Sequence, residues 1–121
     1  FNDFKEEYDD LMAFLSASKI NGVVFLSGDR HHSEIIKADR QGSYPLYDIT
    51  SSPLTSGIST GAEVEKKNPY RIGEQINVHN YTRFSFSGEK QDRKMTVEFI
   101  GINGEKLSGW SVLLKDISHA R

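Results

Sequence analysis

Val23-Val24-Phe25-Leu26 is a continuous apolar run that breaks abruptly into the polar segment Ser27-Gly28-Asp29-Arg30-His31-His32-Ser33. The run does not alternate between apolar and polar residues, which predicts a strand buried on both faces within a sheet covered by helices. Open α/β sheets bind their ligands in the crevice at the carboxyl ends of such strands. The polar segment is therefore the first candidate for a functional site.

The residues before this strand have the periodicity of a helix. Apolar side chains recur on one helical face, and Asn21-Gly22 is a natural stop because both residues tolerate the left-handed conformation that ends helices. We predict a helix from about Asp3 to Ser18. The apolar positions on its face are Phe4, Tyr8, Leu11, Met12 and Leu15.

After the polar segment the sequence predicts mainly strands. A loop rich in Ser, Thr, Gly and charge is expected over Ser51–Gln75, a length that is usually functional. Asn103-Gly104 predicts a hairpin between the last two strands, whose alternating residues indicate one buried face. The fold class is α/β with α+β character, one helix followed mostly by strands. The predicted strands are Glu34–Ala38, Leu46–Thr50, Tyr81–Ser87, Lys94–Ile102 and Lys106–Ile117.

Composition excludes several classes of partner and site. The chain has 121 residues, enough for one domain, and its 15 Lys and Arg against 17 Asp and Glu give no basic surplus for nucleic acid. No apolar stretch approaches the roughly 20 residues that span a membrane. Without cysteine, a metal site must use His, carboxylate and carbonyl ligands. The first residue is not Met, so we expect the chain to be a piece of a longer protein.

Asp29 and His31 have the chemistry of metal ligands. Divalent metals of hard or borderline character prefer carboxylate oxygen and imidazole nitrogen, and a turn at the end of a buried strand would direct both side chains into one crevice. Two metals about 4 Å apart can clamp a phosphate ester and generate hydroxide for in-line attack. The tetrapeptide Gly28-Asp29-Arg30-His31 alone is a weak motif, because such spacing recurs by chance.

The wider segment Gly22–Ile35 closely resembles the last metal motif of PhoD-like (alkaline phosphatase D) metallophosphatases, a branch of the calcineurin-like phosphoesterases. In that family a helix, a short apolar strand and Ser-Gly-Asp-x-His follow in this order. The segment Tyr47–Gly57 is similar to the family's Ser- and Thr-rich segment, and Asn80–Phe84 with the Asn103-Gly104 hairpin is similar to its closing strands. The resemblance covers nearly the whole chain.

The resemblance implies a fold and an activity. Residues 1–121 would form a partial domain, the C-terminal half of a four-layer α/β/β/α sandwich. The complete enzyme would hydrolyse phosphate mono- or diesters with two metal ions, drawn from iron, calcium, zinc or manganese. Asp29 and His31 would hold metal, with Asp29 either binding it directly or orienting a ligand. The family's other motifs, including the usual catalytic His, would lie upstream, so this chain alone should be inactive.

Two neighbouring residues have alternative interpretations. Arg30 could bind a substrate phosphate through its forked guanidinium, or could be a solvated loop charge. His32 would point away from His31 in an extended backbone, which favours a role in orienting a ligand or a surface position over direct metal binding. Only the family resemblance suggests a secreted or periplasmic location.

Other functions stay open at this stage. The chain could be a non-catalytic β-rich binding module whose Asp29–His31 turn is structural, or a degenerate phosphatase relative with a scaffolding role. For partners we expect a phosphate-ester substrate, no nucleic acid and no membrane. An uncovered sheet face and an open sheet edge also predict a homodimer of this chain.

Overall fold

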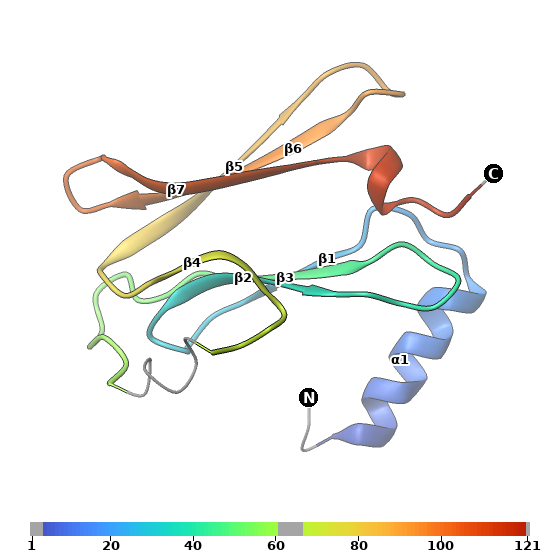
Figure 1. Cartoon of the computed structure of the whole chain (residues 1–121), viewed down its shortest axis with the longest axis horizontal. Coiled ribbons are helices and arrows are strands. Elements are labelled where there is room, and N and C mark those ends of the chain that lie inside the picture. The colour runs from blue at the N-terminus through green and yellow to red at the C-terminus, as the bar shows by residue number, and fades with distance from the viewer. Residues whose placement is uncertain (1–3, 61–66, 121) are drawn as a thin grey trace.

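The computed structural model describes residues 4–60 and 67–120 as one helix and two β-sheets, a mixed α/β arrangement made mostly of strands (Figure 1). The first sheet, sheet A, has the strand order β1-β3-β2-β4, and the second, sheet B, has the order β5-β6-β7. A short 3₁₀ helix, η1, follows β7. The elements are α1 (Lys5–Ala17), β1 (Val24–Ser27), β2 (Ser33–Ala38), β3 (Leu46–Thr50), β4 (Arg71–Ile76), β5 (Asn80–Ser87), β6 (Lys94–Gly101), β7 (Lys106–Leu113) and η1 (Leu114–Ile117).

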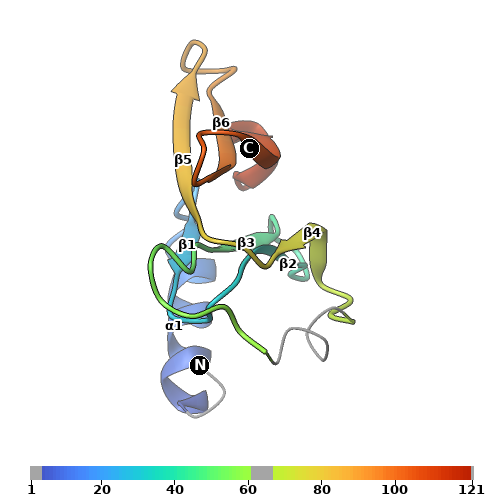
Figure 2. The same cartoon turned by 90° about the vertical axis from the view of Figure 1, so that its left-hand side faces the viewer.

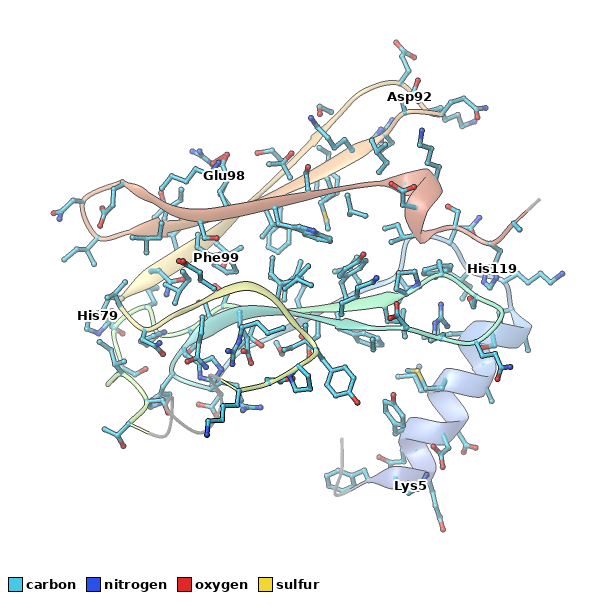
Figure 3. The ribbon with its side chains drawn as sticks, viewed as in Figure 1. Lys5, His79, Asp92, Glu98, Phe99 and His119 are labelled. Atoms are coloured by element: carbon cyan, nitrogen blue, oxygen red, sulfur yellow. The ribbon has the colours of Figure 1, made fainter. Side chains whose placement is uncertain are left out.

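The core lies between the two sheets. Ile35, Ile49 and Tyr47 face sheet B from sheet A, and the ring of Tyr47 lies 4.5 Å from that of Trp110. In β6 the residues alternate between the two sides, so Phe99 points toward sheet A whereas Glu98 points away from it (Figure 3). Phe99 is 2% exposed. The predicted single buried face of the closing strands is therefore confirmed.

The structure of strand β1 differs from the prediction that Val23–Leu26 is buried on both faces. Among the described residues it pairs only with β3, in parallel, at the edge of sheet A, and its residues are half-buried or exposed, so it is not buried on both faces. Leu26 is 66% exposed. The uninterrupted apolar run predicted a strand buried on both faces, because hydrophobicity indicates a tendency to be covered and does not show which elements lie over the strand.

Strand β4 lies within the segment that was predicted to be a loop, so that prediction is wrong for residues 71–75. Within residues 4–60 and 67–120 the strand pairs with β2 alone, and Gly73 and Glu74 are exposed, which is compatible with the polar composition there. The C-terminal strand also ends earlier than predicted, at Leu113, because η1 follows it.

The helix lies on the side of sheet A opposite sheet B, near the end of the molecule that also holds the C-terminus (Figures 1 and 2). It spans Lys5–Ala17, close to the predicted range, whose first residue Asp3 lies outside the described residues. Leu15 is its only buried residue. No helix in the described part of the chain is long and apolar enough to cross a membrane.

Candidate metal-ligand loop

The loop after β1 has an unusual backbone at both predicted ligands. Asp29 has φ 60° and His31 has φ 59°, so each adopts the left-handed conformation with one residue between them. Such conformations are uncommon outside glycine, and they persist where the surrounding structure enforces them, often at functional sites. The backbone is therefore not extended here, and the side-chain alternation used to separate His31 from His32 does not apply.

The loop is held by hydrogen bonds to the segment after β3. The amide N–H of His31 donates to Oγ of Ser52 at 3.0 Å, and the amide of Ser59 donates to the carbonyl oxygen of His31 at 3.0 Å. The amide of Ser51 also donates to the carbonyl of Ser27 at 3.0 Å. The chain on both sides of the loop is thus hydrogen-bonded to residues 51–59. These bonds place the Ser- and Thr-rich segment beside the predicted ligands.

A buried polar cluster lies directly beyond the loop. The hydroxyl of Ser33 lies 2.8 Å from Oδ1 of Asn80 and accepts the amide N–H of Ser52 at 2.9 Å. Nδ2 of Asn80 donates to the carbonyl of Val78 at 2.8 Å. Because Asn80 begins β5, this cluster connects the start of β2 in sheet A with the start of sheet B. Ser33, Ser52 and Asn80 are all buried, so the connection is shielded from competing water.

A second set of hydrogen bonds joins the end of β1 to β3. Oγ of Ser27 donates to Oδ1 of Asp48 at 2.6 Å, and it lies 3.0 Å from Oγ1 of Thr50. Since the single Ser27 proton is directed at the carboxylate, the Thr50 hydroxyl must donate to Ser27. The three side chains occupy the face of sheet A that points away from sheet B, at the strand end from which the Asp29–His31 loop departs.

His32 and Glu34 form a buried ionic group on the same face. Nε2 of His32 lies 3.1 Å from Oε1 of Glu34, and Nε of Arg71 lies 2.6 Å from Oε2 of Glu34. His32 is completely buried, and the Glu34 and Arg71 side chains are nearly so. An ionised Glu34 can only accept hydrogen bonds, so the facing nitrogen of His32 carries a proton. This arrangement fixes the imidazole next to His31.

The structure separates the predicted residues into two environments. Asp29 and Arg30 are exposed and His31 is half-buried, whereas His32 is fully enclosed. The remaining histidines, His79 and His119, lie at opposite ends of the molecule (Figure 3). Among residues 4–60 and 67–120, no group of three or more His, Cys, Asp or Glu side chains could hold a metal. Asp29 and His31 have suitable donor atoms for such an ion but would need further ligands.

Sequence reasoning missed the residues that support the loop. Asp48 had a visible signal, because it is the one charged residue within the apolar strand Leu46–Thr50. Arg71 and Asn80 had no visible signal in the sequence. Arg71 contacts Glu34, which lies 37 positions earlier in the chain, and Asn80 contacts Ser33, which lies 47 positions earlier.

Comparisons of the chain with protein-family models, curated proteins and solved structures find no match.

Proposed function

We propose that this chain supplies the Asp29–His31 ligand loop of a two-metal phosphoesterase of the PhoD-like type. In this proposal the helix and the two sheets are part of a four-layer α/β/β/α sandwich, and the remaining ligands come from outside these 121 residues. The physiological reaction is hydrolysis of a phosphate mono- or diester, for which the metal pair supplies an activated hydroxide. The proposal rests on the resemblance of Gly22–Ile35 to the family's last metal motif.

One structural observation supports the proposal most directly. Two non-glycine residues with metal-binding side chains, Asp29 and His31, are held in the left-handed conformation in a single loop. Each such residue costs free energy relative to a relaxed backbone, of the order of 1–3 kcal/mol. The anchoring of the His31 amide to Ser52 helps to maintain that geometry. A loop held in this way is pre-organised to present its donors without first becoming ordered.

The other residues would have defined tasks. Arg30 stands between the two ligands in sequence and is exposed, so its guanidinium could meet the phosphate oxygens of a substrate. His32, fixed by Glu34, would position the backbone at His31 from beneath the loop. Asp48 and Ser27 would hold the end of β1 in place. None of these tasks requires the side chain to bind metal itself.

The proposal can be tested on the 121-residue chain by NMR with Mn²⁺, because paramagnetic broadening detects even weak binding by two donors. We expect substoichiometric Mn²⁺ to broaden the resonances of Asp29 and His31 first, with His119 at the far end of the molecule as an internal reference. Asp29→Asn and His31→Ala should each remove the selective broadening. The chain alone should not hydrolyse p-nitrophenyl phosphate above background, because two donors cannot complete a two-metal site.

Uniform broadening at His31, His79 and His119, or none at any of them, would refute a metal role for the loop. The chain would then be better described as a non-catalytic β-rich module. Chelator-sensitive hydrolysis of p-nitrophenyl phosphate by the chain alone would instead show that the metal site is complete within these residues.

A further inference from the structure

A group of enclosed nitrogen and oxygen atoms surrounds Tyr44, at the end of sheet A where β1 and β3 begin. Tyr44 precedes β3 and is 6% exposed. The guanidinium carbon of Arg40 lies 4.6 Å from the centre of the Tyr44 ring, and the ring of His119 meets that ring edge-on at 5.1 Å. Arg40 belongs to the turn between β2 and β3, whereas His119 belongs to the tail after η1 (Figure 3). Two distant parts of the chain therefore share one aromatic neighbour.

The positive charge of Arg40 is only partly compensated. Its Nε donates to the carbonyl oxygen of Tyr44 at 3.0 Å, and the guanidinium faces the Tyr44 ring in a favourable cation–π arrangement. Its terminal nitrogens, Nη1 and Nη2, are enclosed and have no hydrogen-bond partner among the described residues. No carboxylate in that part of the chain forms an ion pair with it. Because buried charges are normally paired with an opposite charge, this guanidinium is a candidate binder of an anion.

Two further donors next to Tyr44 are enclosed in the same way. Oγ of Ser43, the residue before Tyr44, and Nε2 of His119 also have no partner within residues 4–60 and 67–120. The turn keeps Ser43 close to Arg40, since the Ser43 amide nitrogen lies 3.5 Å from the Arg40 carbonyl oxygen. A hydroxyl and an imidazole can donate to the same acceptor as a guanidinium. Since buried polar groups almost always have a partner, three such residues around one ring indicate a site for a ligand rich in acceptors.

We propose that Arg40, Ser43 and His119 bind an oxyanion of the phosphate class beside Tyr44. The terminal nitrogens of the guanidinium form a planar fork that matches two oxygens of a phosphate group. Ser43 and His119 donate to its other oxygens. A phosphate group offers three strong acceptor oxygens, which suits donors from three residues better than the two oxygens of a carboxylate.

The enclosed charge selects an anion over water. Water can satisfy the donors one by one, but it leaves the guanidinium charge without a counter-charge. Because the donor atoms are enclosed, the tail after η1 shifts when the anion enters, as interface side chains commonly do on binding. The tail is held by the Ser118 hydroxyl, which donates to the Leu114 carbonyl at 2.6 Å, and by the His119 amide, which donates to Oδ1 of Asn21 at 2.7 Å.

This site is separate from the candidate metal-ligand loop. Strands β1 and β3 are parallel, and Tyr44 lies just before the start of β3, whereas the Asp29–His31 loop follows the end of β1. The two sites therefore lie at opposite ends of sheet A. Binding of the oxyanion needs no metal and does not depend on the proposed hydrolysis.

The test is an NMR titration of the 121-residue chain with inorganic phosphate in metal-free buffer. Sodium chloride at the same ionic strength measures the effect of screening alone. We expect saturable shifts at the side-chain resonances of Arg40 and His119 and at the Ser43 amide, with no comparable shift at His79, at the other end of the molecule. Phosphate should also raise the melting temperature, because a ligand that binds only the folded chain stabilises it. Acetate should bind the same residues more weakly.

Two arginine variants form a matched pair. Arg40→Met removes the enclosed guanidinium, and Arg93→Met removes an exposed one whose Nε also donates to a main-chain carbonyl, that of Gly88 at 3.2 Å. Arg40→Met should weaken phosphate binding by at least about tenfold, because it removes the charge-assisted hydrogen bonds. Arg93→Met should leave binding unchanged. Ser43→Ala, a smaller change that spares the guanidinium, should also weaken binding and serves as the test if Arg40→Met does not fold.

Three outcomes would overturn the proposal. The first is the absence of a saturable shift at Arg40 and His119, or an equal shift with chloride, which would assign these donors to water. The second is equal weakening of phosphate binding by the Arg40 and Arg93 variants. The third is tighter binding of acetate than of phosphate, which would mean that the site accepts a carboxylate, such as an acidic side chain of another polypeptide segment.

Discussion

Nε of Arg71 lies 2.6 Å from Oε2 of Glu34, and both side chains are more than nine-tenths buried. The contact joins β4 to β2 across a segment that includes the long polar loop. Buried ion pairs contribute little net stability compared with apolar residues, but removing one partner leaves a charge without compensation. This asymmetry makes the pair informative in mutational experiments.

Arg71→Met should lower the free energy of unfolding by about 3–5 kcal/mol, because Glu34 would be left as a buried carboxylate without its cation. Urea denaturation of the folded chain measures the change. Arg83→Met is the matched control, since Arg83 pairs with Glu98 at the surface and should matter much less. Combining Arg71→Met with Glu34→Gln should recover part of the loss, whereas strict additivity would show that the two side chains do not interact.

His31→Ala and His32→Ala should have opposite patterns of effect. His32 is fully buried against Glu34, so its replacement should cost about 1–3 kcal/mol of stability through the lost hydrogen bond. His31 is half-buried, and its replacement should change stability by less than about 1 kcal/mol. Selective Mn²⁺ broadening should disappear only in His31→Ala, recorded at a temperature at which both variants are folded. Loss of broadening in His32→Ala alone would mean that the ligand has been assigned to the wrong histidine.

Gly22→Ala tests the turn that leads into β1. Gly22 has φ +74°, and an added Cβ would lie 3.1 Å from Cδ1 of Leu114. Gly42 has a similar φ of +70° with no atom within 4 Å of its added Cβ. Both alanine variants should therefore lose about 1 kcal/mol from backbone conformation, and Gly22→Ala should lose more because of the contact with Leu114. Thermal unfolding of the pair measures that difference, and equal melting temperatures would show that Leu114 moves aside freely.

The pair formed by Arg83 and Glu98 predicts a specific pH dependence. The hydrogen bond from Arg83, aided by its positive charge, lowers the pKa of Glu98 below its ordinary value of 4.5. Its contribution to stability is therefore present at pH above 4.5 and is lost as the pH falls through the lowered pKa. An NMR titration of the Glu98 carboxyl should show the lowered pKa, and Arg83→Gln should return it toward the ordinary value. A normal pKa in the unchanged chain would contradict the ion pair.

The sequence predicted most elements whose signal is local. The helix, the two strands around residues 34–50 and the closing hairpin at Asn103-Gly104 were found because periodicity and turn chemistry depend on neighbouring residues. Strand β4 was missed because an edge strand with one neighbour can be polar, as Gly73 and Glu74 are. The exposure of Leu26 could not be predicted either, since it depends on which strands adjoin β1.

The candidate ligands were predicted from their residue types, but the hydrogen bonds that hold their loop were not. Asp29 and His31 stand out as carboxylate and imidazole after an apolar strand. The bonds that hold their loop come from Ser52 and Ser59, more than 20 residues later, so no local pattern could identify them. The left-handed conformation of both residues could not be predicted from the sequence either, because Asp and His have no strict preference for it.

That conformation has a consequence for how the loop would respond to selection for stability alone. Glycine adopts φ near 60° without steric cost, so Asp29→Gly or His31→Gly would relieve backbone strain while deleting a donor atom. Screens for heat-resistant variants of this chain should therefore recover glycine at positions 29 and 31, at the expense of any bound metal. Retention of both side chains would then require selection for chemistry, since the fold itself would be more stable without them.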